Sequence, residues 1–257
     1  MTHDVWLTKI FNTYLAGVGN GILGLFGLTA ENAREPWADH VVMEILVALL
    51  LVGLLFFLRA RLSVEKPGVT QHIFEIIRDF VVGEADDQVG HDGHRHVTLF
   101  MALFLFVLMG NLIGLIPGFI SPTQAIYVPA GCALVAFVYY NIVGLKKNGL
   151  WKYTKHFFGP IPVMAPLMLP IEIISHLSRV LSLSLRLFGN IFGEELVILI
   201  LFSIVPFLVP LPMMFLGLIT ASLQAFIFVL LSTIYLGGAV ATEHEQHDHA
   251  EMVAGEV

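Results

Sequence analysis

The sequence predicts an all-α integral membrane protein with about five membrane helices, one amphipathic surface helix and a long tilted helical hairpin near its C-terminal end. Of its 257 residues, 57% are apolar and only 13% are charged, which lies outside the usual range for soluble domains. Apolar stretches long enough to cross a hydrocarbon core of about 30 Å follow one another along the chain. We expect one membrane domain at 40–240, with spans at about 41–58, 98–116, 125–143, 168–204 and 213–236.

The two ends of the chain differ from this membrane domain. Residues 1–39 are apolar enough to lie on a membrane surface, but Asn12, Asn20 and several glycines weaken a spanning helix. We expect a non-cytoplasmic interfacial segment there, and a cytoplasmic acidic, histidine-containing tail at 241–257. Cys132 is the only cysteine, so the chain has no disulfide framework. No basic footprint for nucleic acid is present.

The basic residues predict the orientation in the membrane. They gather in the polar loop after the first span and in the loop after the third, whereas the short turns at 117–124 and 205–212 hold none. The positive-inside rule makes the basic loops cytoplasmic, the N-terminus external and the C-terminus cytoplasmic. Within the first loop, residues 70–82 set Ile73 and Phe80 against charged neighbours, which is typical of an amphipathic helix on the membrane surface.

The stretch at 170–205 is apolar overall and yet carries ionisable and amide side chains, namely Glu172, His176, Arg179, Arg186, Asn190, Glu194 and Glu195. A charge near the bilayer centre costs roughly 3 kcal/mol on insertion scales. Arginine cannot avoid this cost by losing its proton. Arg186 therefore requires a functional or structural partner.

Helical spacing places the polar residues of this stretch on one side. Glu172, Arg179 and Arg186 are spaced seven apart, so they fall almost on one line of a helix. Ser175, Gly189 and other small residues share that side, where a partner helix could approach closely. The stripe must face protein or trapped water rather than lipid. The alternative is that Arg179 and Arg186 pair with carboxylates inside the bundle.

The length of the stretch adds a constraint. About 36 helical residues at about 1.5 Å each exceed the thickness of the hydrocarbon core, so the helix must tilt or run partly along the membrane. Pro206, Pro210 and Pro212 end it. Residues 213–236 then return as an apolar helix that carries Gln224.

Two strings in this hairpin resemble subunit a of rotary F-type ATP synthases. They are SLRLFGN at 184–190, followed by Glu194 and Glu195, and LQAFIF at 223–228. The resemblance extends over about 67–237. It implies a non-catalytic, proton-translocating stator subunit in a hetero-oligomeric complex, lying against the c-ring and the peripheral stalk b subunits in a bacterial plasma membrane. It implies no cofactor and no metal.

The resemblance also implies roles for single residues. Arg186 would face the carboxylate that each c-ring subunit carries in the membrane. Glu195 would belong to an external half-channel, and Glu172 and Ser175 to an internal one. Asn190 and Gln224 would line the region near Arg186. Glu194 either joins the external set or is a solvated interfacial acid. His176 is either a packing histidine or a proton relay.

The sequence departs from the family pattern at three places. Pro122 and Thr123 are not followed by the aspartate and asparagine found in many members, Gly114 stands where some carry an acid, and Gly217 where others have histidine or glutamate. The external half-channel is then expected to rely more heavily on Glu195 and water.

Two other classes of protein remain as alternatives. A secondary transporter could also bury arginine and glutamate, but we find no internal repeat. A membrane metalloenzyme would use the histidine clusters at 91–96 and 243–249 as ligands. Both clusters lie in polar segments without an evident buried second shell, so solvated side chains are the expectation.

Overall fold

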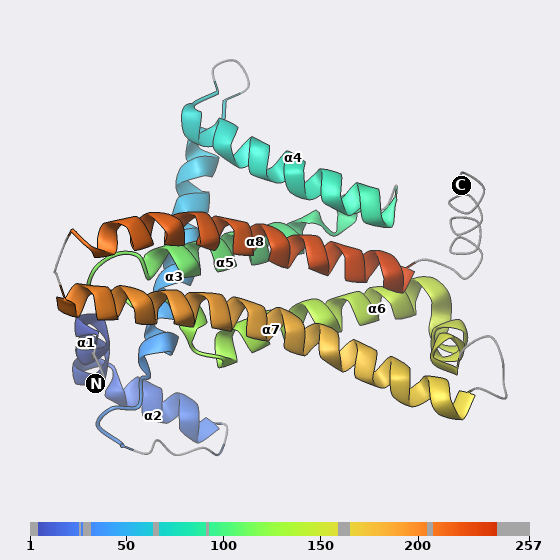
Figure 1. Cartoon of the computed structure of the whole chain (residues 1–257), viewed down its shortest axis with the longest axis horizontal. Coiled ribbons are helices and arrows are strands. Elements are labelled where there is room, and N and C mark those ends of the chain that lie inside the picture. The colour runs from blue at the N-terminus through green and yellow to red at the C-terminus, as the bar shows by residue number, and fades with distance from the viewer. Residues whose placement is uncertain are drawn as a thin grey trace. The chain divides into compact units, whose positions relative to one another are not determined.

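The computed structural model consists of helices and connecting segments (Figure 1). It describes residues 5–25, 27, 32–63, 67–90, 93–158, 165–204 and 208–240, and for 150–158 and 165 the backbone alone. The α-helices are α1 (Trp6–Tyr14), α2 (Ala16–Leu25), α3 (Asp39–Arg61), α4 (Val69–Val89), α5 (Val97–Ile113), α6 (Tyr127–Phe158), α7 (Ala165–Ile204) and α8 (Pro210–Val240). Two short 3-10 helices are η1 (Gly93–Arg95) and η2 (Pro122–Gln124).

The helical lengths confirm an all-α membrane fold. Four helices are long and apolar enough to cross a membrane: Asp39–Arg61, Tyr127–Gly149, Pro166–Ile204 and Pro210–Val240. The remaining expected span, at about 98–116, is α5, which has 17 residues and falls just short of the about 20 that a straight span needs. The described residues contain no strand.

Prolines explain where the observed ends of the hairpin helices differ from expectation. Helix α7 begins at Ala165, so Pro170 lies inside it. Helix α8 begins at Pro210 and includes Pro212, although the sequence suggested a start at 213. Pro210 and Pro212 lie in the first turn of α8, where a missing N–H has no helical partner. Helix α8 therefore begins at residues that look like breaks, whereas Pro170 lies beyond the first turn of α7.

Helix α6 contains one break, at Gly149. This residue has φ 73° and ψ 157°, a conformation that only glycine adopts readily. The apolar membrane-length part thus ends at Gly149, immediately after Lys146 and Lys147. The helix then resumes in a different direction.

The first of two compact units comprises 1–71, 105–129 and 186–225. Its apolar core gathers Val5, Met43, Val47 and Ile113 from α3, α5 and the N-terminal segment. The N-terminal segment is also tied to the residues before α3, since the Asn12 amide donates to the Trp37 carbonyl oxygen over 3.2 Å. Its expected interfacial, non-cytoplasmic location stays a prediction.

The second unit comprises 72–104, 130–185 and 226–257, of which the tail 241–257 lies outside the described residues. Helices α4 and α8 pack together in it. The rings of Phe80 and Phe226 stack with centroids 4.6 Å apart. Gly237 lies against the backbone carbonyl of Gln88, with no room for a side chain.

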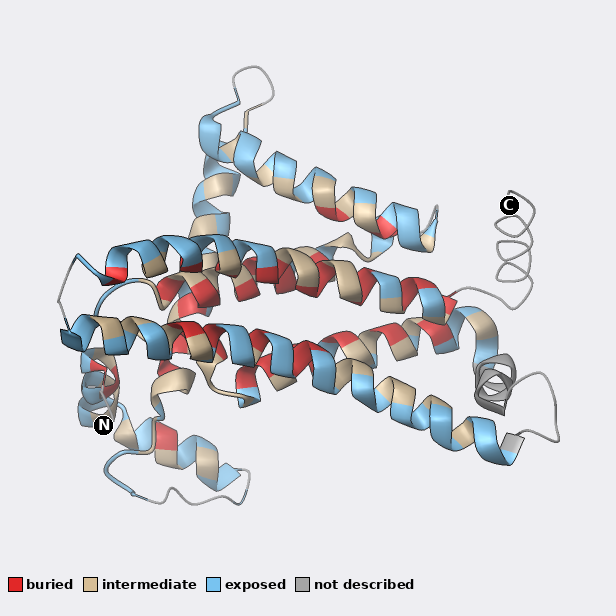
Figure 2. Cartoon of the chain, in the orientation of Figure 1, coloured by how far each residue is buried: buried red, intermediate tan, exposed pale blue. Residues whose placement is uncertain are grey.

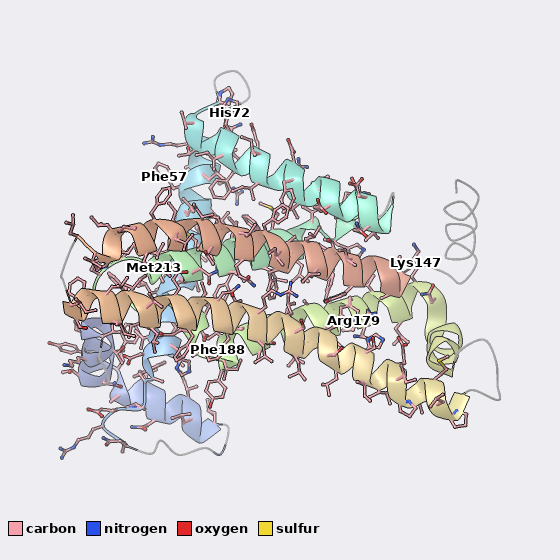
Figure 3. The ribbon with its side chains drawn as sticks, in the orientation of Figure 1. Phe57, His72, Lys147, Arg179, Phe188 and Met213 are labelled. Carbon is pink, nitrogen blue, oxygen red and sulfur yellow. The ribbon has the colours of Figure 1, made fainter. Side chains whose placement is uncertain are left out.

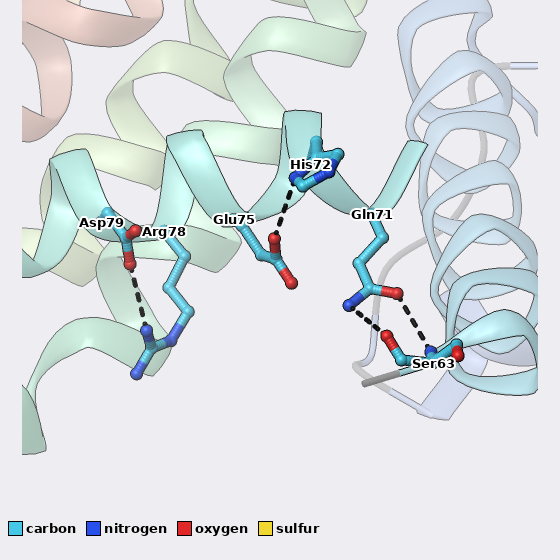
Figure 4. Close-up of polar contacts among 6 residues, drawn as sticks. All are labelled: Ser63, Gln71, His72, Glu75, Arg78 and Asp79. Atoms are coloured by element: carbon cyan, nitrogen blue, oxygen red, sulfur yellow. Dashed lines mark hydrogen bonds and ion pairs between the residues drawn. The ribbon is translucent and has the colours of Figure 1, made fainter. Parts of the chain in front are cut away.

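Helix α4 corresponds to the expected surface helix, and at Val69–Val89 it is longer than the predicted 70–82. The start of the helix carries polar contacts, of which those between Gln71 and Ser63 are part-buried (Figure 4). Gln71 donates to the Ser63 carbonyl and accepts from its N–H, over 3.2 and 3.1 Å. Within the second unit, Arg78 pairs with Asp79 over 3.2 Å. Exposed Ile73 and these exposed charges together fit a membrane surface.

Gly237 gives a direct test of the α4–α8 packing. We expect Gly237→Ala to lower the free energy of unfolding by about 1–3 kcal/mol, because the new methyl group must displace the Gln88 backbone. The matched control is Gly238→Ala, because a methyl group there meets nothing within 4 Å. Denaturant unfolding of the purified chain in detergent measures both. Equal stability of the two variants would contradict this packing.

Candidate functional site

Helix α7 buries one narrow face in the part that belongs to the first unit. Leu187 and Ile191 are 0% and 3% exposed, and Glu194 is 8% exposed. Arg186 and Asn190 are exposed on the same helix, and Figure 2 shows buried and exposed residues alternating along α7. The buried face therefore coincides neither with the polar stripe of Glu172, Arg179 and Arg186 nor with the opposite side of the helix. The polar stripe is left uncovered around Arg186.

Arg186 lies on the uncovered face without a partner in the described part of the chain. No hydrogen bond or ion pair joins it to any of those residues. Gly189 and Gly193 follow it at spacings of three and seven, and a methyl group at either would meet nothing within 4 Å. The alternative that Arg186 pairs with a carboxylate of its own bundle finds no support among the described residues. Two glycines in open space thus follow Arg186 along the helix.

Glu195 is held by the backbone of a distant loop in the first unit. Its carboxylate Oε1 accepts a hydrogen bond from the Ser121 N–H over 2.8 Å. The Ser121 hydroxyl donates to the Gly110 carbonyl over 2.9 Å and lies 2.7 Å from the Thr123 hydroxyl. Thr123 in turn donates to Asn111 Oδ1 over 2.6 Å. A chain of polar groups therefore leads from Glu195 into α5.

Two glycines make room for the two acids of α7. A Cβ at Gly217 would collide with the Glu194 carboxylate, and one at Gly114 would lie 2.6 Å from Glu195 Oε1. Gly114 and Gly217 are the positions at which some members of the family that the sequence resembles carry an acid or a histidine. The chain supplies both carboxylates from α7 instead. Glu194 is buried, and its carboxylate fills the space beside Gly217.

Asn190 and Gln224 are brought together in the first unit. The Asn190 amide donates to Gln224 Oε1 over 2.9 Å, and Gln224 is 2% exposed. Within the described residues, Gln224 Nε2, Glu194 Oε2 and Asn111 Nδ2 are buried without a hydrogen-bond partner. Buried polar atoms in this condition bind water where space allows. These three atoms of the first unit thus remain available to water.

The second unit holds the earlier residues of α7. His176 Nε2 lies 3.4 Å from Glu172 Oε1, one helical turn away. Ser175 is half-buried beside them. Arg179 places its guanidinium 5.1 Å from the centre of the Tyr235 ring, a cation–π contact, and is labelled in Figure 3. In the described residues Arg179 therefore contacts an aromatic ring. The carboxylate partner that the sequence left open as an alternative is not found there.

Comparisons with known proteins identify the family of this chain. The family described as ATP synthase A chain matches residues 41–237. The chain belongs to this family. An ATP synthase subunit a of Solibacter usitatus is 47% identical over 235 residues, covering 91% of this chain and all of that protein. One from Koribacter versatilis is 41% identical over 247 residues, covering 95% of this chain and all of its own length.

Membership of the ATP synthase A chain family confirms the resemblance and favours it over the transporter and metalloenzyme alternatives. Within the described ranges, no three His, Cys, Asp or Glu side chains gather in a way that could hold a metal ion. His91, Asp92 and the tail cluster at 243–249 lie outside those ranges.

Sequence reasoning on this family member missed Ser121, and it singled out Thr123 only as a departure from the pattern. Asn111, the one strongly polar side chain of its predicted span, received no role. The usable signal was a short run of hydroxyl residues next to Pro122 in an otherwise apolar region. The contact of the Ser121 N–H with Glu195, 74 positions away, depends on how the helices pack.

The fit between Glu194 and Gly217 predicts a specific epistasis in this family member. We expect Gly217→Ala to destabilise the protein by about 1–3 kcal/mol, because its methyl group overlaps the Glu194 carboxylate. The double variant Gly217→Ala/Glu194→Ala should recover most of that loss. Gly53→Ala, in open space on α3, is the control. Unfolding in detergent gives the three values, and the absence of recovery would refute the proposed contact.

Proposed function

We propose that this protein is the proton-translocating stator subunit of a rotary ATP synthase, in which Arg186 faces the membrane carboxylates of the c-ring. One observation carries the proposal. Arg186 is exposed on a membrane-length helix and has no partner in the described part of its own chain. A permanent charge cannot face lipid at low cost, so another polypeptide must cover it. The family of this chain indicates a multi-subunit ATP synthase as the setting.

The chemistry of the covering group follows from the charge. An acid carried through lipid is neutral, because desolvation disfavours its ionised form. Beside Arg186 the ionised form becomes favourable, and the proton can leave. When the acid regains a proton, its attraction to the guanidinium falls and it can move on. Proton flow is then coupled to rotor movement without a covalent step.

Two separate sets of residues supply the proton paths. The external half-channel uses Glu195, with Glu194, Asn190 and Gln224, all in the first unit. The polar chain through Ser121 and Thr123 and the unpartnered buried amides support a water-filled path there. The internal half-channel uses Glu172, Ser175 and His176, all in the second unit. Arg186 lies between the two sets along α7 and repels a stray proton.

The same proposal specifies the surroundings of the subunit. It is a non-catalytic, multi-pass protein of the bacterial plasma membrane that contacts the c-ring and the peripheral stalk b subunits. By the positive-inside rule, the basic residues at the ends of α3 and of the apolar part of α6 support a cytoplasmic position for those ends. The N-terminus is then external, and the tail 241–257 is cytoplasmic.

Replacing Arg186 tests the proposal. We expect Arg186→Ala to abolish ATP-driven proton pumping in inverted vesicles, because no fixed cation remains to ionise the rotor carboxylate. Assembly should persist, since the described residues make no ion pair with Arg186. Arg78→Ala is the control, because Arg78 is exposed on α4 and pairs only with its neighbour Asp79 in the described structure. Normal pumping by Arg186→Ala would end the proposal.

Replacing Glu195 tests the external path separately. Glu195→Gln keeps an oxygen that can accept the Ser121 N–H but cannot take up a proton. We expect passive proton flux through the membrane sector to fall about tenfold or more. Glu44→Gln, on α3, controls for removal of an acid from a membrane helix. An unchanged flux in Glu195→Gln would place the external path elsewhere.

A further inference from the structure

A buried tyrosine of α6 contacts the His176–Glu172 pair inside the second unit. Tyr140 is 2% exposed. Its hydroxyl oxygen lies 3.2 Å from His176 Nδ1, and the two rings stack at 23° with centroids 6.1 Å apart. No role follows for this residue from the family strings at 184–190 and 223–228. The contact joins α6 to α7 through the imidazole ring.

The partners on the two ring nitrogens determine the tautomer of His176. An ionised carboxylate can only accept, so the Nε2 that faces Glu172 carries the proton in the neutral ring. Nδ1 is then the acceptor, and the Tyr140 hydroxyl donates to it. A hydrogen bond on one ring nitrogen fixes the tautomer and orientation that the other nitrogen presents.

We propose that Tyr140 is a positioning residue of the internal half-channel, which holds His176 so that Nε2–H is presented to Glu172. The inference rests on the proposed function, because it assigns a new member to one of its two paths. Stacking fixes the plane of the ring, and the hydroxyl fixes which nitrogen faces the acid. His176 is thereby a component of the path rather than only a packing histidine.

The arrangement allows the pair to take up and release one proton. A proton from the internal side binds either the Glu172 carboxylate or His176 Nδ1. In the second case the Tyr140 hydroxyl rotates, and its oxygen accepts the new Nδ1–H. Tyr140 keeps its own proton throughout, and only O–H or N–H bonds form and break. Release toward the rotor reverses these steps.

Several charged and titratable groups influence this pair within the second unit. Glu172 and Arg179 are on α7, and Tyr140 is on α6. From α8, Tyr235 places its ring 6.2 Å from that of Tyr140 and 5.1 Å from the Arg179 guanidinium. Groups that interact closely titrate together, so the pH dependence of transport reflects the whole cluster rather than one residue. Tyr140 acts on that dependence through His176.

The test compares two adjacent tyrosines of α6 in the assembled ATP synthase. Tyr140→Phe removes only the hydroxyl and keeps the stacked ring. We expect the pH midpoint of ATP-driven proton pumping in inverted vesicles to shift by about 0.5–1 unit, the effect of one lost hydrogen bond on a titrating group. Tyr139→Phe is the control, because the Tyr139 hydroxyl bonds His96 instead, over 2.8 Å. Its pH profile should match that of the unmodified complex.

A double variant separates positioning from a structural role. In a His176→Gln background, Tyr140→Phe should add no further shift, because the ring that it orients is absent. Two outcomes would overturn the inference: an unshifted pH profile in Tyr140→Phe, or the same shift with and without His176. Arg186→Ala distinguishes this failure from failure of the proposed function, since it can abolish pumping whatever Tyr140 does. Levels of assembled complex, measured for every variant, identify any loss through misfolding.

Discussion

A guanidinium that cannot lose its charge lies on an open face of a membrane helix, and this constraint organises the rest of the molecule. Arg186 is flanked on that face by glycines rather than by acids of its own chain. A permanent internal partner would satisfy the charge and remove any preference for an external one. The absence of such a partner among the described residues leaves the site suited to an acid that comes and goes.

The acids of α7 are held by neutral groups in both units. Glu195 accepts from a backbone N–H, and Glu172 lies beside an imidazole. In the described residues neither of them has an arginine or lysine partner. A carboxylate bound by neutral donors exchanges its proton more readily than one locked to a fixed cation, because an opposite charge strongly stabilises the ionised form. Among the described residues, the chain thus gives these two acids no fixed cation and gives Arg186 no carboxylate.

Much of the fold could be predicted from hydropathy and spacing, because long apolar runs have few alternatives in a membrane. The start of α8 was expected at 213 rather than at Pro210, because Pro210 and Pro212 look like breaks but are accommodated in its first turn. The polar residues of α7 were found because charge stands out in an apolar helix. The contacts of Glu195 with Ser121, Glu194 with Gly217 and Tyr140 with His176 were not, because each joins helices whose packing the sequence does not determine.

The most direct measurement is to identify the polypeptide that covers Arg186 in the assembled complex. A photocrosslinking residue at Gly189, three positions further along the same open face, would report its neighbour after illumination, with mass spectrometry of the product. The account predicts a crosslink to the acid-bearing helix of a rotor subunit. A crosslink confined to this chain, or to lipid, would contradict it.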